Sequence, residues 1–188
     1  GLAWYPGDTV NTSIGQGFML ATPLQLAGAT ARVAARGQVR APRLVQAVGE
    51  RPLPAGKTRS PINTTAANWD RVIGAMKGVV HEERGTARRA LAGLTYTMAG
   101  KTGTAQVVGM KQNVRYDITK VAKLRRDHAL FIAFAPVESP RIAVSVLVEN
   151  GEHGSSTAAP VARQVVDAFM RLYPAAGVAP APSAPAPP

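Results

Sequence analysis

Four consecutive residues, Lys101-Thr102-Gly103-Thr104, are the part of the sequence best suited to chemistry. Lys101 supplies a fixed positive charge, and the hydroxyl groups of Thr102 and Thr104 can donate hydrogen bonds to a ligand. Gly103 has no side chain to obstruct a ligand that lies along the backbone. The tetrapeptide therefore predicts a site for an anion such as a carboxylate. Taken alone, it is equally consistent with an ordinary strand that carries a surface lysine.

The residues around and after this tetrapeptide predict the sheet that positions it. A strand is expected at residues 95–108, which include the tetrapeptide. Residues 128–136 and 142–148 are apolar on both faces, which is typical of central strands covered on both sides. A polar turn lies between these two runs, so they are expected to form a hairpin. A further short strand is expected at residues 44–48.

A helix is expected to begin after Thr22. The Thr22 side chain can cap the helix, Pro23 suits the first helical position, and Gln25 can bond back to the N–H of the capping residue. The helix is expected to continue through Ala35 and to stop at Gly37, since glycine often ends helices. Residues 1–21, which precede it, contain several glycines and are expected to be loop and turns.

Two further helices are indicated by apolar residues at helical spacing. One is expected to begin at Thr64 or Thr65, and its apolar face is formed by Trp69, Val72, Ile73, Met76 and Val80. The other lies near the end of the chain, and its apolar stripe is formed by Val161, Val165, Ala168, Phe169 and Leu172.

The order of these elements predicts an α+β fold, an antiparallel sheet flanked by helices rather than a doubly wound parallel sheet. Residues 1–173 are expected to belong to one domain. Residues 174–188 are almost entirely Ala and Pro, so we expect a disordered tail. The polar segment 109–127 is expected to be a long loop, with or without a short helix.

Composition excludes several classes of function. The 188 residues include no cysteine, which excludes disulfides, thiolate metal sites and cysteine catalysis. The three histidines are scattered without metal-ligand spacing, and we expect no cofactor and no metal. A net charge of +11 attracts polyanions, but aromatic residues make up only 5% of the chain and no RNA-stacking motif is present, so nucleic-acid binding is disfavoured.

Several ordered motifs accompany the Lys-Thr-Gly-Thr tetrapeptide. They are Trp4-Tyr5-Pro6-Gly7-Asp8-Thr9, Ile14-Gly15-Gln16-Gly17, Thr22-Pro23-Leu24-Gln25, Gly85-Thr86-Ala87, Lys101-Thr102-Gly103-Thr104-Ala105-Gln106 and Arg125-Arg126-Asp127-His128. In this order they resemble class B penicillin-binding proteins, most closely the penicillin-binding protein 2 branch that acts in cell elongation. The resemblance covers residues 1–173 and implies the C-terminal part of a penicillin-binding transpeptidase domain, a β-lactamase-like fold.

The resemblance implies a peptidoglycan D,D-transpeptidase that cross-links stem peptides through an acyl-enzyme and is a target of β-lactam antibiotics. It implies that Lys101 and Thr104 are catalytic, and that Lys101, Thr102, Gly103 and Thr104 bind the substrate. The parent protein is expected at the periplasmic face of the bacterial inner membrane, held by an N-terminal anchor. Its expected partners are a glycan polymerase and rod-shape scaffold proteins.

The sequence departs from this family pattern in one respect. Class A β-lactamases and penicillin-binding proteins combine Lys-Thr-Gly with Ser-x-x-Lys and a Ser-x-Asn type motif. None of the serines in the 188 residues is followed by Lys three places on, or by Asn or Asp two places on. We therefore expect the nucleophile to lie upstream of Gly1, and the chain by itself not to catalyse acyl transfer.

Two alternatives remain open beside the transpeptidase. One is a non-catalytic penicillin-fold binding or sensor module, and the other is a relative of the serine β-lactamases. The segments at residues 15–17 and 151–154 are interpreted as turns that shape the fold rather than as substrate contacts. His81, His128 and His153 are interpreted as structural or solvated residues.

Overall fold

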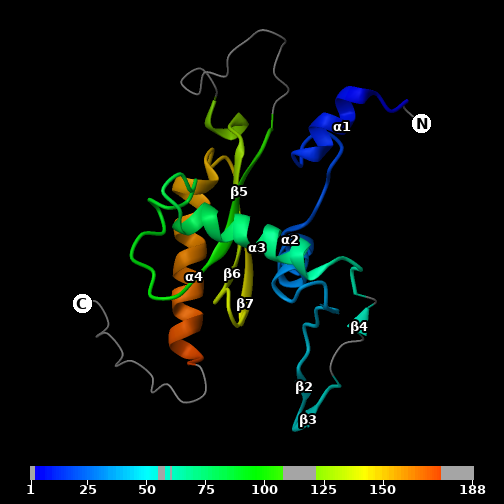
Figure 1. Cartoon of the computed structure of the whole chain (residues 1–188), viewed down its shortest axis with the longest axis vertical. Helices are drawn as coiled ribbons and strands as arrows, with labels where there is room; N and C mark the ends of the chain where they lie inside the picture. Colours follow the sequence, from blue (N-terminus) through cyan, green and yellow to red (C-terminus); the bar gives the residue numbers. More distant parts are fainter. Residues whose placement is uncertain (1–2, 55–57, 60, 108–121, 175–188) are drawn as a thin grey trace.

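The computed structural model describes residues 3–54, 58–59, 61–107 and 122–174. Its centre is an antiparallel sheet of three strands, β5 (Ala99–Ala105), β6 (His128–Ala135) and β7 (Ile142–Val148), in the order β5-β6-β7. Figure 1 shows α4 (Ala159–Leu172) on one side of this sheet and α2 (Pro23–Ala34) on the other, with α3 (Ala66–His81) crossing between them. The predicted antiparallel sheet flanked by helices is confirmed.

The hairpin β6–β7 is confirmed, whereas the strand that carries Lys101 is shorter than expected. It runs over residues 99–105 instead of 95–108. Its N-terminal end is set by Thr97 and Met98, whose polar groups bond to side chains and backbone outside the sheet. Gly100 allows β5 to lie close to β6, because a Cβ there would lie 2.6 Å from the ring of Phe131.

Two groups of buried residues, one on each face, hold the sheet between its helices. Successive side chains of a strand point to opposite faces, so Phe131 and Phe134 of β6 belong to different groups. Phe131 packs in the larger group, with Ala162 and Val166 of α4. Phe134 packs with Ala99 and Ile73 in the smaller group, next to α2 and α3. This explains why both strands of the hairpin are apolar throughout.

The two predicted helix starts are confirmed. The Thr22 hydroxyl accepts from the N–H of Gln25, and the Gln25 side chain accepts from the N–H of Thr22 at 2.8 Å, so that both form a capping box. Thr65 caps α3 by accepting from the N–H of Asn68. The chain leaves α2 through Gly37, which has a positive φ of 91° and lies against Trp69 of α3.

Three expectations were wrong in detail. Residues Pro6–Ser13 form helix α1 rather than loop, because Pro6 occupies the first helical position and the Asp8 carboxylate accepts from the N–H of Tyr5. On α4 the buried side chains are Ala159, Ala162 and Val166, whereas Val161 and Val165 are exposed. The buried positions of α4 thus lie one residue after the predicted Val161 and Val165. Val72 of α3 is likewise 46% exposed and not part of the core.

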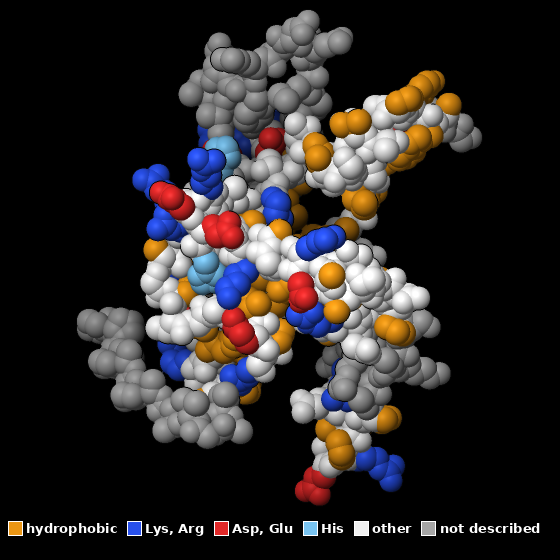
Figure 2. Space-filling model, viewed as in Figure 1, with side chains coloured by type: hydrophobic (Ala, Val, Ile, Leu, Met, Phe, Trp, Pro, Cys, Tyr) orange, Lys and Arg blue, Asp and Glu red, His pale blue; other side chains and the backbone are white. Residues whose placement is uncertain are grey.

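The segment between α2 and α3 forms a projecting arm instead of a longer strand (Figures 1 and 2). The strand expected at residues 44–48 reduces to β2 (Ala47–Val48), paired with β3 (Arg51–Pro52). At the base of the arm, β1 (Val39–Arg40) pairs with β4 (Thr58–Arg59). Within the described residues, no helix is both long and apolar enough to span a bilayer.

Two sequence expectations fall largely outside the described residues. Of the loop expected at residues 109–127, residues 109–121 lie outside the described residues, and the described remainder includes a short 3-10 helix, η2 (Lys123–Arg125). The Ala/Pro tail from residue 174 onward also lies outside the described residues, except for its first residue.

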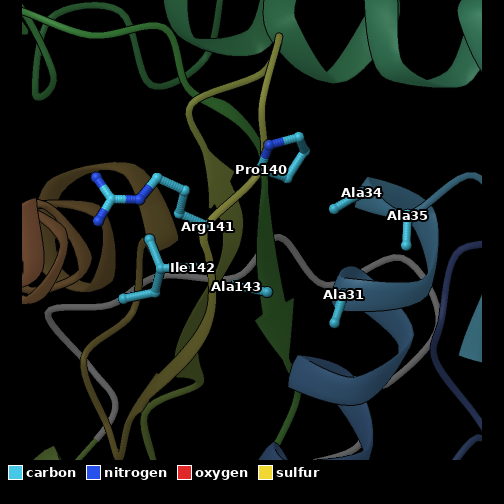
Figure 3. Close-up of a pocket in the computed structure, with 7 residues that line it drawn as sticks. All are labelled: Ala31, Ala34, Ala35, Pro140, Arg141, Ile142 and Ala143. Atoms are coloured by element: carbon cyan, nitrogen blue, oxygen red, sulfur yellow. The ribbon is translucent and has the colours of Figure 1, made fainter. Parts of the chain in front are cut away.

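One edge of the central sheet is an apolar strand without a strand partner in the described part of the chain. β7 pairs with β6 alone, and its seven residues include no charge and no proline. Figure 3 shows the adjoining groove, where Pro140 and Ala143 face Ala31 and Ala34 of α2. An unpaired apolar edge offers free backbone N–H and C=O groups to another chain.

We therefore predict that the isolated 188-residue chain associates through β7. Leu147 is the most exposed side chain of this strand, and Leu147→Lys should raise the monomer fraction measured by light scattering, since a lysine on an edge disfavours pairing. Val72→Lys makes the same kind of change on an exposed position of α3 and should leave association unchanged. A wild-type chain that is already monodisperse would contradict the prediction.

Candidate active site on the open edge of strand β5

The four residues singled out in the sequence lie together along one cleft. The cleft has a volume of about 410 Å³, and the side chains and backbone that line it come from four separate segments. The lining residues are Ile14, Gln16, Thr86, Lys101, Thr102, Gly103, Thr104, His153, Gly154 and Ser155. The cleft therefore combines an ammonium group, several hydroxyl groups and an imidazole, and includes no carboxylate among these residues.

Strand β5 forms an edge of the sheet, and its outward backbone groups face this cleft. The register pairs Thr102 with Phe131 and Thr104 with Ala129 of β6. The carbonyl oxygens of Thr102 and Thr104 nevertheless accept from side chains. The Nζ of the neighbouring Lys101 lies 2.7 Å from the Thr102 oxygen, and the Gln16 Nε2 lies 3.3 Å from the Thr104 oxygen. In an antiparallel strand the N–H and C=O of one residue point to the same side. Both threonines thus offer backbone donors and acceptors to a ligand.

The loop between α3 and β5 places Thr86 beside the tetrapeptide. The Thr86 and Thr102 hydroxyl oxygens lie 3.2 Å apart, within hydrogen-bond distance. The far end of this loop is fastened to α4, because the Tyr96 hydroxyl donates to the Asp167 carboxylate at 2.6 Å. Burial, followed by the bond to Asp167, raises the pKa of Tyr96 above its ordinary value, so this hydroxyl keeps its proton and its bond at physiological pH.

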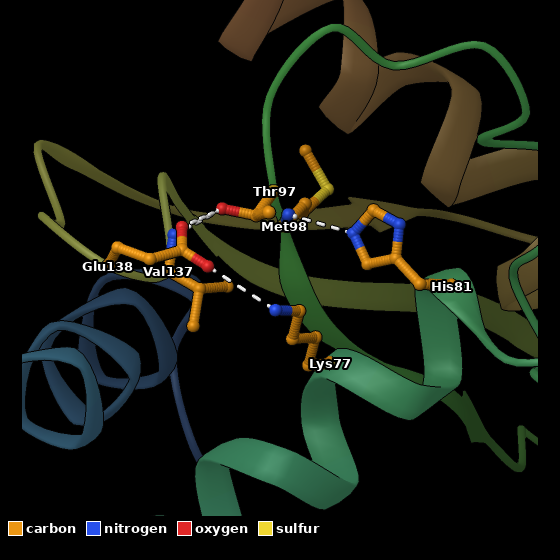
Figure 4. Close-up of polar contacts among 6 residues, drawn as sticks. All are labelled: Lys77, His81, Thr97, Met98, Val137 and Glu138. Carbon is orange, nitrogen blue, oxygen red and sulfur yellow. Dashed lines mark hydrogen bonds and ion pairs between the residues drawn. The ribbon is translucent and has the colours of Figure 1, made fainter.

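Polar contacts with α3 and with the β6–β7 turn fix the start of β5 (Figure 4). The N–H of Met98 donates to the His81 Nε2 at 3.0 Å. The Thr97 hydroxyl donates to the Glu138 carboxylate and accepts from the N–H of Val137. The Thr97 hydroxyl, followed by weaker contributions that include Lys77, lowers the pKa of Glu138 below its ordinary value. These bonds hold the strand in place just before Lys101.

The other wall of the cleft is the turn between β7 and α4. The Arg126 Nη1 lies 2.6 Å from the Glu152 Oε1, and the N–H of Glu152 donates to the Asp127 carbonyl at 2.9 Å. The N–H of Asn150 donates to the His128 Nδ1 at 2.9 Å. The turn is therefore tied to the segment that leads into β6, at the end of the sheet where β5 finishes.

A backbone contact between two glycines brings this wall against β5. Gly154 begins the single-turn π-helix η3 (Gly154–Ala158) and is fully enclosed. A Cβ on Gly154 would lie 2.2 Å from the Leu130 carbonyl oxygen and 2.8 Å from that of Gly103. Only glycine permits this approach. Gly103 thus serves both as an unobstructed part of the cleft and as the surface on which Gly154 packs.

The sequence identified the strand residues of the cleft but not those that face them. Gln16, Thr86 and the segment His153–Ser155 line the same cleft as Lys101–Thr104. Gly15 and Gly17 do have positive φ, so the turn predicted at residues 15–17 is real, yet it also presents Gln16 to Thr104. The glycines next to these residues predicted turns, but they did not show that the turns would lie against β5.

The Lys-Thr-Gly motif, which here lies on an edge strand beside an open cleft, is one of three motifs found in class A β-lactamases and penicillin-binding proteins. A sequence model described as the penicillin binding protein transpeptidase domain matches residues 2–167, and the chain belongs to this family. The resemblance to the penicillin-binding protein 2 branch is confirmed by the following relatives.

The chain is 41% identical over 171 residues to the peptidoglycan D,D-transpeptidase MrdA of Haemophilus influenzae. The match covers 89% of this chain and 26% of that protein. It therefore spans about a quarter of the length of this curated relative. Among solved structures, Pseudomonas aeruginosa PBP2 in complex with WCK 5153 is 46% identical with a TM-score of 0.75, covering 90% of this chain and 35% of that one. Helicobacter pylori PBP2 in complex with MreC is 30% identical, with a TM-score of 0.75. The match covers 92% of this chain and 29% of the Helicobacter pylori chain.

The glycine contact yields a stability prediction. Gly154→Ala should lower the free energy of unfolding by about 1–3 kcal/mol, because the added methyl group meets backbone oxygens that cannot move aside easily. Gly74→Ala is the matched control, since nothing lies within 4 Å of a Cβ at this α3 position. The control should raise stability by about 0.5–1 kcal/mol. Urea unfolding at concentrations without association measures both, and equal effects of the two variants would contradict the assignment.

Proposed function

We propose that the chain is the C-terminal part of a peptidoglycan D,D-transpeptidase domain that cross-links stem peptides during cell elongation. The observation that supports this most strongly is the placement of Lys101, Thr102, Gly103 and Thr104 on the open edge of β5, where they line one cleft. Residues 1–173 would belong to this domain and residues 174–188 to a disordered tail.

In the proposed reaction a serine attacks the penultimate D-Ala of a stem peptide, releases the terminal D-Ala and passes the acyl group to the amine of a neighbouring strand. Thr102 and Thr104 hydroxyls would hold the substrate carboxylate, since both line the cleft and can donate. Lys101 would polarise the site and assist proton transfer. The backbone N–H of Thr104 would form half of the oxyanion hole and stabilise charge that develops in the transition state.

The open edge of β5 also supplies the means of holding an extended peptide. The Thr104 carbonyl, which now accepts from Gln16, faces the cleft and can accept from a substrate amide instead. Main-chain pairing of this kind provides affinity without dependence on the side chains of the peptide. A β-lactam antibiotic, which carries an amide and a carboxylate, would occupy the same groups.

The cellular setting follows from the family resemblance and is part of the proposal. The longer protein would lie at the periplasmic face of the inner membrane on an N-terminal anchor, beside a glycan polymerase and rod-shape scaffold proteins. Support for a scaffold partner comes from the Helicobacter pylori relative, whose PBP2 is in complex with MreC. The proposal for this chain requires neither a metal nor a cofactor.

A sensor module and a β-lactamase are two other possible functions, and each would treat bound penicillin differently from a transpeptidase. A sensor module would bind penicillin without turnover, and a β-lactamase would hydrolyse it. Identity of 41% to MrdA favours the transpeptidase over both.

The 188-residue chain alone should not form a covalent adduct with a fluorescent penicillin, because none of its serines is followed by lysine three places on. Denaturing electrophoresis after incubation checks this, with Pseudomonas aeruginosa PBP2 as the positive control. A labelled band of the 188-residue chain that survives denaturation would show that the nucleophile lies within it.

A chimera tests the role of Lys101 directly. Residues 3–174 of this chain replace the aligned segment of Pseudomonas aeruginosa PBP2, to which the chain is 46% identical. The chimera should be acylated by the fluorescent penicillin, and Lys101→Ala should lower the acylation rate constant by about 10²–10³-fold. Lys77→Ala removes a lysine outside the cleft, in a surface ion pair with Glu138, and should change the rate by less than about twofold. Equal rates in the two variants would rule out the assignment of Lys101.

A further inference from the structure

His153 faces the cleft but has no part in the function proposed above. His153 lines the cleft together with Lys101, Thr102 and Thr104, and it is exposed. Contacts with β5 fix the backbone on both sides of this residue. Before it, the Thr104 hydroxyl lies 3.4 Å from the Glu152 carbonyl oxygen, and after it Gly154 packs on Gly103. His153 is therefore held alongside the strand.

The backbone that leads to His153 is held in a conformation that side chains disfavour. Glu152 has a φ of +67° and Asn150 a φ of +56°, both in the left-handed region. Such a conformation is unfavourable for a residue with a side chain and persists only where its surroundings impose it. Here the Arg126–Glu152 ion pair and the bonds to Asp127 and His128 impose it. Strain that is held in this way beside a cleft is typical of residues that position a functional group.

The charges around His153 leave its imidazole available to a ligand. The ammonium group of Lys101 is contributed by β5. The Glu152 carboxylate, on the same turn, pairs with Arg126, and the Asp127 Oδ1 accepts from the N–H of Val107 at 3.3 Å. No hydrogen bond of the His153 ring to another described residue is present. A ligand carboxylate in this cleft would meet two potentially cationic groups.

We propose that His153 is a substrate-binding residue that contacts the carboxylate of the acyl donor and makes binding dependent on pH. The proposal rests on the function proposed above and adds a contact to it. Histidine can change its charge between about pH 5 and pH 8, and its protonated form is positive. As the pH falls through this range, attraction to the carboxylate should increase. A charge pair at about 4 Å in water corresponds to roughly a fivefold change in affinity, so a rise of about three- to tenfold is expected.

The probe for the experiment is N-acetyl-D-alanyl-D-alanine, titrated into the 188-residue chain at a concentration without association. Shifts of the Thr102 and Thr104 amide signals in NMR spectra report the dissociation constant at pH 5.5 and pH 8. Affinity should be about three- to tenfold higher at pH 5.5 in the wild type. His153→Gln should abolish this difference. Lys101→Ala should weaken binding at both pH values.

A second probe and an internal reference control for indirect effects. N-acetyl-D-alanyl-D-alaninamide has no carboxylate and should bind more weakly, with no rise at low pH. The His153 ring signal should move when the acid probe is added, whereas those of His81 and His128, which accept from backbone N–H groups, should not. These ring signals are measured on the wild-type chain, so the result does not depend on whether a variant folds.

The possible outcomes separate the two proposals. Binding that depends on Lys101 but is the same at both pH values, or is unchanged by His153→Gln, would overturn the role of His153 and leave the proposed function in place. A wild type that binds neither probe at either pH would contradict both proposals.

Discussion

Within the described part of the chain, strand β5 pairs only with β6, and the candidate site depends on this open edge. Because N–H and C=O groups of one residue point to the same side of an antiparallel strand, Thr102 and Thr104 present theirs to the cleft. Lys101 and Gln16 bond to the two carbonyl oxygens in the structure. Three other segments of the chain, around Gln16, Thr86 and His153, then close around the same edge.

Packing on the covered side of the sheet keeps that edge in place. Glycines at 100, 103 and 154 allow β5, β6 and the turn after β7 to approach more closely than side chains would permit. Polar contacts hold both ends of β5: His81 and Glu138 bond to residues at its start, and the Glu152 carbonyl accepts from Thr104 near its end. The cleft is thus positioned by backbone contacts and hydrogen bonds more than by a surrounding apolar core.

The sequence predicted the sheet, the helix starts and the strand residues of the site, because each follows from local patterns. A capping threonine with Pro and Gln after it, and an apolar run of strand length, are local features. Gln16, Thr86 and His153 could not be assigned, since their roles arise from contacts between segments that lie far apart in the sequence, such as Gln16 with Thr104. The stripe of α4 was misplaced for a related reason: Ala162 and Val166 are buried by what they pack against, not by greater hydrophobicity than Val161 and Val165.

We propose that the outward edge of β5 binds the substrate of an acyl-transfer site. A crystal structure of the penicillin-acylated chimera tests it most directly. We expect the acyl amide to pair with the Thr104 carbonyl in place of the Gln16 side chain, and the penicillin carboxylate to lie within hydrogen-bond distance of the Thr102 and Thr104 hydroxyls. An adduct that leaves the Gln16–Thr104 bond intact, with its carboxylate away from β5, would contradict it.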